Sequence, residues 1–187
     1  MRIFIALDIP EDIRNHLTRY VERMQPLAPS AHWSRPESLH VTLKFVGQAS
    51  EAKVEEIRQA LFQVAFHPFE VEFRNTGFFP SARAPRIFWA GVESPRVLRS
   101  LAAAVDAALE KIGITHEDKP YHPHLTLARS GPERAAEHSF EQLPSRLPVE
   151  IPHFGTMTAQ DFFLYKSEPM PGGSRYTKLE RFPLQGN

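Results

Sequence analysis

The sequence predicts an α+β fold, and three observations support this class. Short segments rich in β-branched and aromatic residues alternate with helices that carry one apolar face. Hydrophobic residues make up 42% of the 187 residues, enough for one core, so we expect a single domain over residues 1–187. A four-residue pattern, His-x-Thr-Leu, occurs once in each half of the chain and indicates an internal duplication.

The first half of the chain is expected to alternate strand and helix. Residues 3–7 form an apolar run that suits a buried strand, and Pro10, followed by two acidic residues, favours a helix to about Met24. Residues 39–46 are rich in β-forming residues and predict a second strand. Ser50 is a candidate N-cap of a helix whose apolar face carries Val54, Ile57, Leu61 and Val64.

A hairpin and a long helix occupy the middle of the chain. Residues 69–79 and 86–92 predict two paired strands across a proline-containing turn. A helix over residues 94–111 is expected to end before Gly113. Its apolar face carries Val97, Leu98, Leu101, Val105 and Leu109.

Shorter elements complete the expected fold. Residues 125–128 predict a strand and residues 132–143 a short helix. Three closing strands are expected at residues 149–154, 161–166 and 176–184, with Pro171-Gly172-Gly173 as a loop between the last two.

Composition excludes several classes of function. Lysine plus arginine equals aspartate plus glutamate, 22 against 22, so no global basic field favours a long nucleic acid. The absence of cysteine excludes disulfides, thiolate nucleophiles and zinc-thiolate sites. The sequence shows no signal peptide and no apolar segment of membrane-spanning length. We therefore expect a cytoplasmic protein that is a monomer and has no obligate protein partner.

The repeated pattern points to a pair of reactive groups. His40-Val41-Thr42-Leu43 and His124-Leu125-Thr126-Leu127 lie about half a chain length apart. Residues two apart on a strand share a face, so each histidine projects together with its threonine. Imidazole transfers protons near neutral pH, and threonine hydroxyls hold negative charge, a combination that suits hydrolysis of a phosphate ester without a cofactor. A single His-x-Thr would more often be structural, but two copies favour function.

Three nearby residues have an open role. Lys44 would share the face of His40 and reach a phosphate, or else be a solvated lysine at a strand edge. Arg129 is five residues after His124, so it faces the same cavity only if the strand ends or bulges near Ala128. Phe45 could stack on a nucleobase, although its odd offset from His40 favours the core.

A metal site is the less favoured interpretation of the second motif. His122 and His124 could face the same way, but a proline lies between them and no carboxylate is close in sequence. We therefore expect neither a metal nor another cofactor.

Longer fragments around the motifs resemble one family. These are MRIFIALD at residues 1–8, LHVTLKFVG at 39–47, PHLTLAR at 123–129 and YTKL at 176–179. Together they resemble the 2H phosphoesterase superfamily, in particular its RNA 2′,3′-cyclic phosphodiesterase branch, also called 2′-5′ RNA ligases. The resemblance covers most of the chain.

The resemblance implies both a fold and an activity. The fold would have two pseudo-symmetric lobes, each with an antiparallel sheet and flanking helices, and a groove between them. The activity would be hydrolysis of an RNA-terminal or nucleoside 2′,3′-cyclic phosphate to the 2′-phosphomonoester. By analogy His124 would be the general base and His40 the general acid, with Thr42, Thr126, Lys44 and Arg129 binding the phosphate.

Other functions stay open at this point. A relative could act on another small phosphodiester, such as ADP-ribose 1″,2″-cyclic phosphate or a 2′-5′ linkage, and reversible 2′-5′ ligation could accompany hydrolysis. A non-catalytic module that binds phosphorylated RNA ends is an alternative from a different class. The sequence does not distinguish these substrates.

Overall fold

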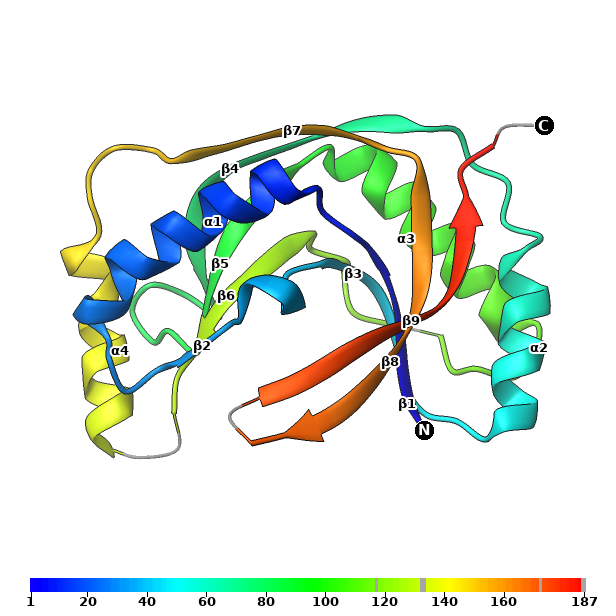
Figure 1. Cartoon of the computed structure of the whole chain (residues 1–187), viewed down its shortest axis with the longest axis horizontal. Coiled ribbons are helices and arrows are strands. Elements are labelled where there is room, and N and C mark those ends of the chain that lie inside the picture. Colours follow the sequence, from blue (N-terminus) through cyan, green and yellow to red (C-terminus); the bar gives the residue numbers. More distant parts are fainter. Residues whose placement is uncertain (117, 132–133, 172, 186–187) are drawn as a thin grey trace.

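The computed structural model describes residues 1–116, 118–131, 134–171 and 173–185. Within these residues it contains two antiparallel β-sheets and four α-helices (Figure 1). This arrangement confirms the predicted α+β class. No helix of this part of the chain has both the length and the apolar character needed to cross a membrane.

The first sheet combines strands from the two ends of the chain. Its order is β3 (Val41–Gln48), β1 (Arg2–Leu7), β8 (Asp161–Met170) and β9 (Gly173–Pro183). Alternation along β1 gives the sheet two different faces: Ile3, Ile5 and Leu7 enter the main core. Phe4 and Ala6 form a small separate cluster with Tyr165 on the opposite face. This second face is the one that carries His40.

The second sheet contains the middle of the chain. Its order is β2 (His32–Trp33), β6 (His124–Arg129), β5 (Ile87–Glu93), β4 (Phe69–Phe79) and β7 (His153–Ala159). The predicted hairpin is therefore confirmed as β4 and β5, which pair along most of their length. Phe88 and Phe73 are fully buried in the main core, on the face turned away from His124.

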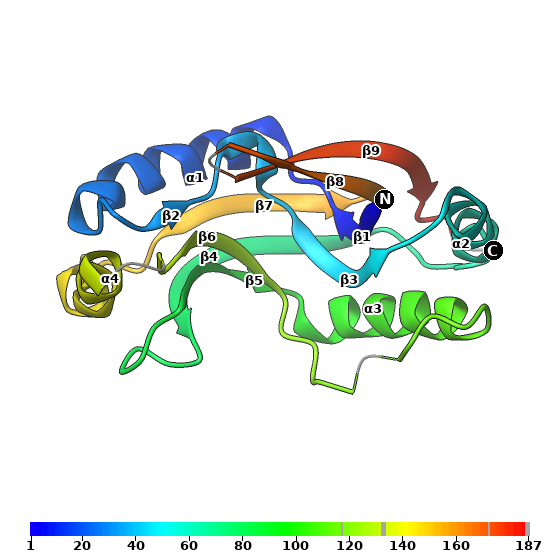
Figure 2. The same ribbon diagram turned by 90° about the horizontal axis from the view of Figure 1, so that it is seen from below.

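Each of the two long helices follows a strand of one sheet in the sequence but packs against the other sheet. The helix α1 (Glu11–Met24) follows β1 of the first sheet but packs against β7 of the second. The helix α3 (Pro95–Glu110) follows β5 of the second sheet but packs against β3 of the first, next to α2 (Glu51–Leu61). Figure 2 shows α1 and α3 on opposite sides of the strands. The two sheets consequently share one continuous hydrophobic core.

A close approach fixes α1 on the second sheet. Gly155 of β7 has a φ of +134°, and a Cβ at this position would lie 2.9 Å from Cγ1 of Ile13. Only glycine adopts this backbone conformation without strain and also leaves room for the helix. The interlocked arrangement therefore depends on one small residue in β7.

Several boundaries match the predictions. Glu11 and Asp12 lie in the first turn of α1, and Ser50 caps α2, since its side chain accepts a hydrogen bond from the Lys53 N–H. The helix α4 (Arg134–Arg146) runs three residues further than expected. Pro132 and Gly172, which mark an expected helix start and loop, lie outside the described residues.

Two expectations were wrong. The helix α2 ends at Leu61, so Val64 lies beyond it and only packs against the core from a loop. The strand expected at residues 149–154 is instead β7, which begins at His153. Pro148 and Pro152 have no N–H to donate to a sheet, and Val149 is fully exposed. Apolar composition alone therefore misplaced this strand.

Candidate active site

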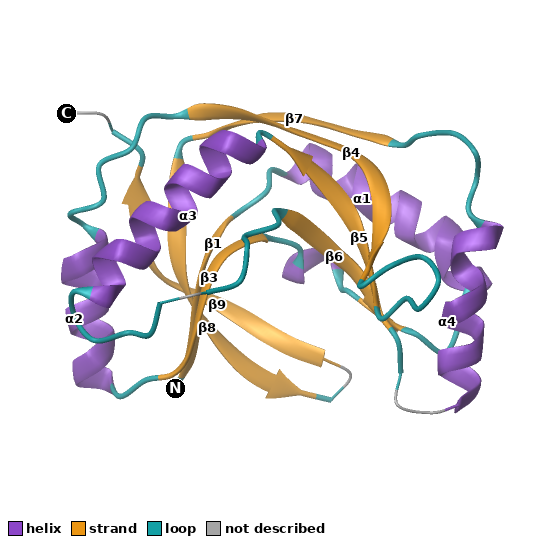
Figure 3. Ribbon diagram, turned by 180° about the vertical axis from the view of Figure 1, so that it is seen from behind, coloured by secondary structure: helices purple, strands orange, loops and turns teal. Residues whose placement is uncertain are grey.

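The two His-x-Thr pairs meet where the two sheets approach each other. His40 directly precedes β3, His124 begins β6, and these two strands contact each other. Figure 3 shows β3 and β6 in the centre of the molecule. Each histidine and each threonine is half-buried, whereas the residues that follow them, such as Leu43 and Leu127, are buried.

The two imidazole rings are held in the same way. Nδ1 of His40 lies 2.7 Å from the carbonyl oxygen of Ser38, and Nδ1 of His124 lies 2.7 Å from that of His122. A carbonyl oxygen only accepts hydrogen bonds, so in both rings Nδ1 carries the hydrogen. Nε2 of each neutral ring is therefore the free acceptor, able to take a proton from a substrate or water.

Each imidazole also packs against an aromatic ring at nearly a right angle. The rings of His40 and Tyr176 are 5.1 Å apart at 90°, and those of His124 and Phe79 are 5.0 Å apart at 85°. These contacts, together with the carbonyl bonds, leave each ring little freedom to rotate. The two halves of the site thus orient their histidines by equivalent contacts.

Burial holds both histidines in the neutral form at neutral pH. It is the main cause that lowers the pKa of His40 to about 4, while the Ser38 carbonyl and then the Asp8 carboxylate act in the opposite direction. Burial also lowers the pKa of His124, and the positive charge of Arg129 acts in the same direction. The charge of His124 itself lowers the pKa of His40, which shows that the two rings are electrostatically coupled.

A β-bulge follows the threonine in both motifs. On β3, Thr42 pairs with Ala6 and Lys44 with the adjacent Ile5, so Leu43 is an extra residue. On β6, Thr126 pairs with Trp89 and Ala128 with the adjacent Phe88, so Leu127 is extra. A bulge reverses the alternation of side chains beyond it. The residue five after each histidine consequently shares the histidine's face.

This bulge satisfies the condition set for Arg129. Arg129 is exposed on the face of β6 that carries His124 and Thr126, and its charge acts on His124. A cation in this position is suited to an anionic phosphate.

The same bulge overturns the expected position of Lys44. Lys44 is only 6% exposed and faces away from His40; its Nζ lies 2.5 Å from Oδ1 of Asp106 and donates to the carbonyl oxygen of Thr115 at 2.8 Å. Lys44 lines a hollow that also contains Thr42 and His124, but Asp106 already neutralises its charge. The prediction that Lys44 shares a face with His40 was wrong because simple alternation ignores the extra residue.

The bulge also places Phe45 on the opposite face from the one expected. Phe45 is 59% exposed and lies on the histidine face, so the preference for a core position was wrong. Phe45 and Phe79 both line a hollow of about 480 Å³ that reaches from Thr42 and His124 towards α3. Two aromatic rings beside a reactive group are suited to contact a nucleobase.

The described residues contain no group of three or more His, Asp or Glu side chains arranged to hold a metal ion. In the second motif, Nδ1 of His124 is taken up by the His122 carbonyl.

Comparison with known proteins places the chain in a family. The family model described as LigT-like phosphoesterase matches residues 7–89 and 91–176, and each matched stretch contains one His-x-Thr-Leu motif. The chain belongs to the LigT-like phosphoesterase family. A curated relative from Methanothermobacter thermautotrophicus, named RNA 2′,3′-cyclic phosphodiesterase, is 33% identical and aligned over 98% of this chain and 99% of its own.

Solved structures, among them that of LigT, have the same fold. A structure from Thermus thermophilus matches with a TM-score of 0.81 and 32% identity, over 100% of this chain and 99% of its own. E. coli LigT in complex with 3′-AMP matches with a TM-score of 0.79 and 26% identity, over 98% and 97% of the two chains. The two-sheet architecture is therefore that of the family.

Several residues of this LigT-like site were not identified from the sequence. Asp8, at the end of β1, forms ion pairs with Lys178 and with Arg14, the latter at 2.8 Å. Arg14 also donates to the carbonyl oxygens of Pro36 and Leu39, next to His40. Asp8 lies in the N-terminal fragment that carries the resemblance, which was the only available signal. The other contacts join distant segments and leave no local pattern.

Trp89 forms part of the second sheet's reactive face because its neighbour is a glycine. A Cβ on Gly77 would lie 2.2 Å from Cζ2 of Trp89, so the indole lies directly over the β4 backbone. Trp89 is opposite Thr126, and its ring is 5.3 Å from that of Phe79. Gly77 thus allows the aromatic wall beside the second motif.

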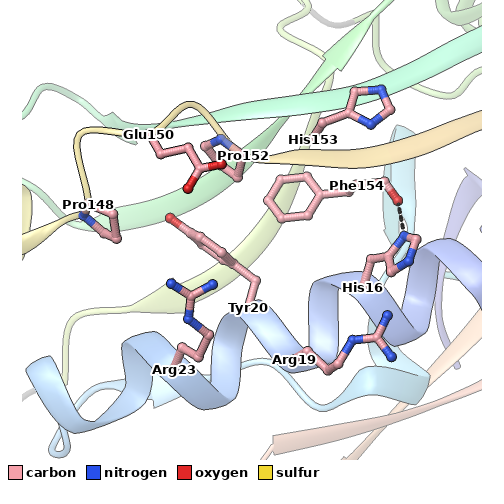
Figure 4. Close-up of a pocket in the computed structure, with 9 residues that line it drawn as sticks. All are labelled: His16, Arg19, Tyr20, Arg23, Pro148, Glu150, Pro152, His153 and Phe154. Carbon is pink, nitrogen blue, oxygen red and sulfur yellow. Dashed lines mark hydrogen bonds between the residues drawn. The ribbon is translucent and has the colours of Figure 1, made fainter.

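A second hollow of about 350 Å³ lies elsewhere, between α1 and the segment that enters β7 (Figure 4). His16 is followed two residues later by Thr18, but both lie on the helix α1, where residues two apart do not share a face. The Thr18 hydroxyl donates to the Arg14 carbonyl, and both histidines of this hollow are engaged with the protein. His16 bonds the carbonyl oxygen of Phe154 through Nδ1 at 2.7 Å, and His153 is 3.2 Å from Glu72. This hollow does not reproduce the paired groups of the first.

Proposed function

We propose that this protein hydrolyses the 2′,3′-cyclic phosphate of RNA ends or of nucleosides to the 2′-phosphomonoester, in the cytoplasm and as a monomer. The observation that carries the proposal is the pair of histidines with Nδ1 fixed on a backbone carbonyl and Nε2 free. The curated relatives named RNA 2′,3′-cyclic phosphodiesterase and the 3′-AMP complex of E. coli LigT support this substrate class.

His124 acts as the general base and His40 as the general acid in this proposal. Nε2 of His124 takes a proton from water, whose oxygen attacks phosphorus, and Nε2–H of His40 protonates O3′ as the P–O3′ bond breaks. Asp8 favours the charged form of His40, but burial lowers the pKa of His40 more strongly; burial and Arg129 both lower that of His124. The assignment of the two roles therefore follows the family resemblance. The bound phosphate anion raises the pKa of both rings and compensates for their burial.

The remaining contacts would orient the phosphate and the base. The hydroxyls of Thr42 and Thr126 donate to the non-bridging oxygens, and Arg129 neutralises their charge. Phe45 stacks on the base of the nucleotide. Lys44 has no place among the phosphate ligands, because its ammonium is paired with Asp106.

The test is hydrolysis of 2′,3′-cyclic AMP in EDTA by the wild type, His40→Ala and His124→Ala. We expect 2′-AMP from the wild type and a loss of kcat of at least about 10²-fold in each variant. The matched control is His16→Ala, because His16 also bonds a carbonyl through Nδ1 but lies in the second hollow.

Three results would contradict the proposal. Binding without turnover by the wild type would favour the non-catalytic binder of RNA ends. Preferential turnover of ADP-ribose 1″,2″-cyclic phosphate or of a 2′-5′ linkage would assign a different substrate. Equal turnover by the wild type and both histidine variants would remove the two-histidine mechanism.

A further inference from the structure

Each threonine carbonyl of the two motifs is bonded by a hydroxyl from the segment that precedes the other motif. The Tyr121 hydroxyl donates to the carbonyl oxygen of Thr42 at 2.8 Å, and the Ser34 hydroxyl donates to that of Thr126 at 2.7 Å. Tyr121 comes three residues before His124, and Ser34 six residues before His40. The two contacts are therefore reciprocal, although the residues that make them differ.

We propose that Tyr121 and Ser34 are positioning residues that together hold the two motif strands at the separation the reaction requires. We call the two hydrogen bonds the reciprocal brace. This inference rests on the proposed function, since it assigns to each hydroxyl a role in that reaction through the strand that it bonds.

The brace acts where the sheets themselves give the motif strands least support. β3 is the edge strand of the first sheet, so its outer carbonyls depend on donors from outside the sheet. β2 ends at Trp33, and beyond it Ser34 continues along β6: its N–H donates to the carbonyl oxygen of Leu127 at 2.8 Å. The Tyr121 hydroxyl thus satisfies a carbonyl on the open edge of β3, and the Ser34 hydroxyl satisfies one on β6 just beyond the end of β2.

The bonded carbonyls also lie next to the bulges. Leu43 and Leu127 are the extra residues, and each directly follows a braced threonine. A bulge disrupts the ladder locally, and the brace supplies a bond beside that disruption. Loss of the brace would let each bulge shift, and would thereby displace Phe45 on β3 and Arg129 on β6.

Tyr121 is itself held firmly, as a positioning residue must be. Arg99 of α3 contacts the Tyr121 carbonyl at 3.4 Å, and Lys44 fixes the same loop through the carbonyl of Thr115. Burial raises the pKa of the Tyr121 phenol, so its hydroxyl keeps the hydrogen that it donates. His122, whose carbonyl orients His124, is the next residue in this loop.

The kinetic test compares Tyr121→Phe and Ser34→Ala, each of which removes one hydroxyl. We expect kcat for 2′,3′-cyclic AMP to fall about tenfold in each while KM stays within about twofold, because misplaced groups slow the chemical step. The double variant is expected to lose more than the product of the single losses. Ser34→Thr, which keeps a hydroxyl, should restore most of kcat.

Matched controls are Tyr20→Phe on α1 and Ser100→Ala on α3, whose hydroxyls lie away from the motifs and should leave kcat unchanged. All variants are measured below their unfolding midpoints, so a mere loss of stability would leave kcat intact. Unchanged kcat in Tyr121→Phe and Ser34→Ala, or a rise in KM alone, would overturn the inference.

A second measurement does not depend on activity. The chain has no cysteine, so Gln48→Cys on β3 and Thr158→Cys on β7, both exposed, place two nitroxide labels on the two sheets alone. We expect the label distance distribution to shift or broaden in Tyr121→Phe and Ser34→Ala. An unchanged distribution would overturn the brace, whereas failure of the wild type to turn over substrate would overturn only the proposed function.

Discussion

The strands β3 and β6 begin with the same four-residue pattern and bulge at the same place, yet the residues beyond the bulge differ in character. On the core face, the position of Lys44 on β3 is taken by Ala128 on β6. On the histidine face, the position of Phe45 is taken by Arg129. The shared part orients two equivalent histidines. The part that differs places an aromatic ring on the histidine face of β3 and a positive charge on the histidine face of β6.

The two core-facing residues, Lys44 and Ala128, are accommodated differently. The first sheet buries an ion pair at this position, whereas the second buries an apolar side chain. Ala128 is fully buried against the core and needs no partner. Lys44 is equally enclosed and depends on Asp106, which is 8% exposed. Removing one member of such a pair leaves an uncompensated buried charge.

Lys44→Met is therefore expected to have the largest effect on stability. Removing the ammonium that lies 2.5 Å from the buried Asp106 carboxylate should cost about 3–5 kcal/mol of unfolding free energy, measured by urea denaturation. Asp106 keeps its contact with His116, which lies 2.5 Å away but is itself exposed. The matched control is Lys166→Met: Lys166 pairs with Glu168 at 2.8 Å but both are about one-third exposed, so it should cost at most about 1 kcal/mol. Lys44→Met/Asp106→Leu should regain much of the loss. Equal costs for the two lysine variants would refute the role of the buried pair.

Phe45 and Arg129, which both lie on the histidine face, are expected to affect the kinetics in different ways. Phe45→Ala should raise KM for 2′,3′-cyclic AMP by the loss of about 1–3 kcal/mol of stacking, and should leave ribose 2′,3′-cyclic phosphate, which has no base, unaffected. Arg129→Ala should lower kcat/KM about tenfold for both substrates, an effect that decreases at high salt. Steady-state kinetics with the two substrates separate these roles. If both variants affected both substrates alike, the division of the groove would be wrong.

The smallest expected effect is a shift of the pH profile. The base must be neutral and the acid protonated, so kcat/KM is highest between the two histidine pKa values of the free enzyme. Burial lowers both, that of His40 to about 4, so the optimum of kcat/KM should lie below about pH 6.5. The optimum of kcat should lie at higher pH, because the bound phosphate raises both pKa values.

The variant Asp8→Asn identifies the limb of the pH profile that reports the titration of His40. Asp8→Asn removes a charge that raises the pKa of His40, so one limb should move to lower pH while the other stays. If kcat and kcat/KM had the same optimal pH, the bound phosphate would not raise the pKa values of the two histidines.

Local sequence signals predicted most of the secondary structure. Proline and acidic residues at the start of α1, the Ser50 cap of α2 and the apolar face of α3 each act within one or two helical turns. The hairpin of β4 and β5 likewise depends on alternation and an adjacent turn. Such features need no information from the rest of the chain. The strand β7 was misplaced because its pairing partner, β4, lies about 80 residues earlier and sets its register.

The duplicated His-x-Thr-Leu pattern correctly placed His40 with Thr42 and His124 with Thr126 on shared strand faces, because period-two alternation holds up to the bulge. Beyond that point the sequence alone gave the wrong face for Lys44 and the wrong preference for Phe45. A bulge depends on how a strand pairs with its neighbour, which no local pattern in this sequence revealed.

The sequence by itself determined the α+β class, the family and the pairing of each histidine with its threonine, since each of these is carried by residues close together in the chain. Only the tertiary structure decided which side chains reach the groove, how the histidines are oriented and which residues brace the motif strands. The Ser38 and His122 carbonyls act locally, but Tyr121 and Ser34 bond carbonyls 79 and 92 residues away. Such contacts arise from the way the two sheets and crossing helices pack, and they exist only once the whole chain has folded.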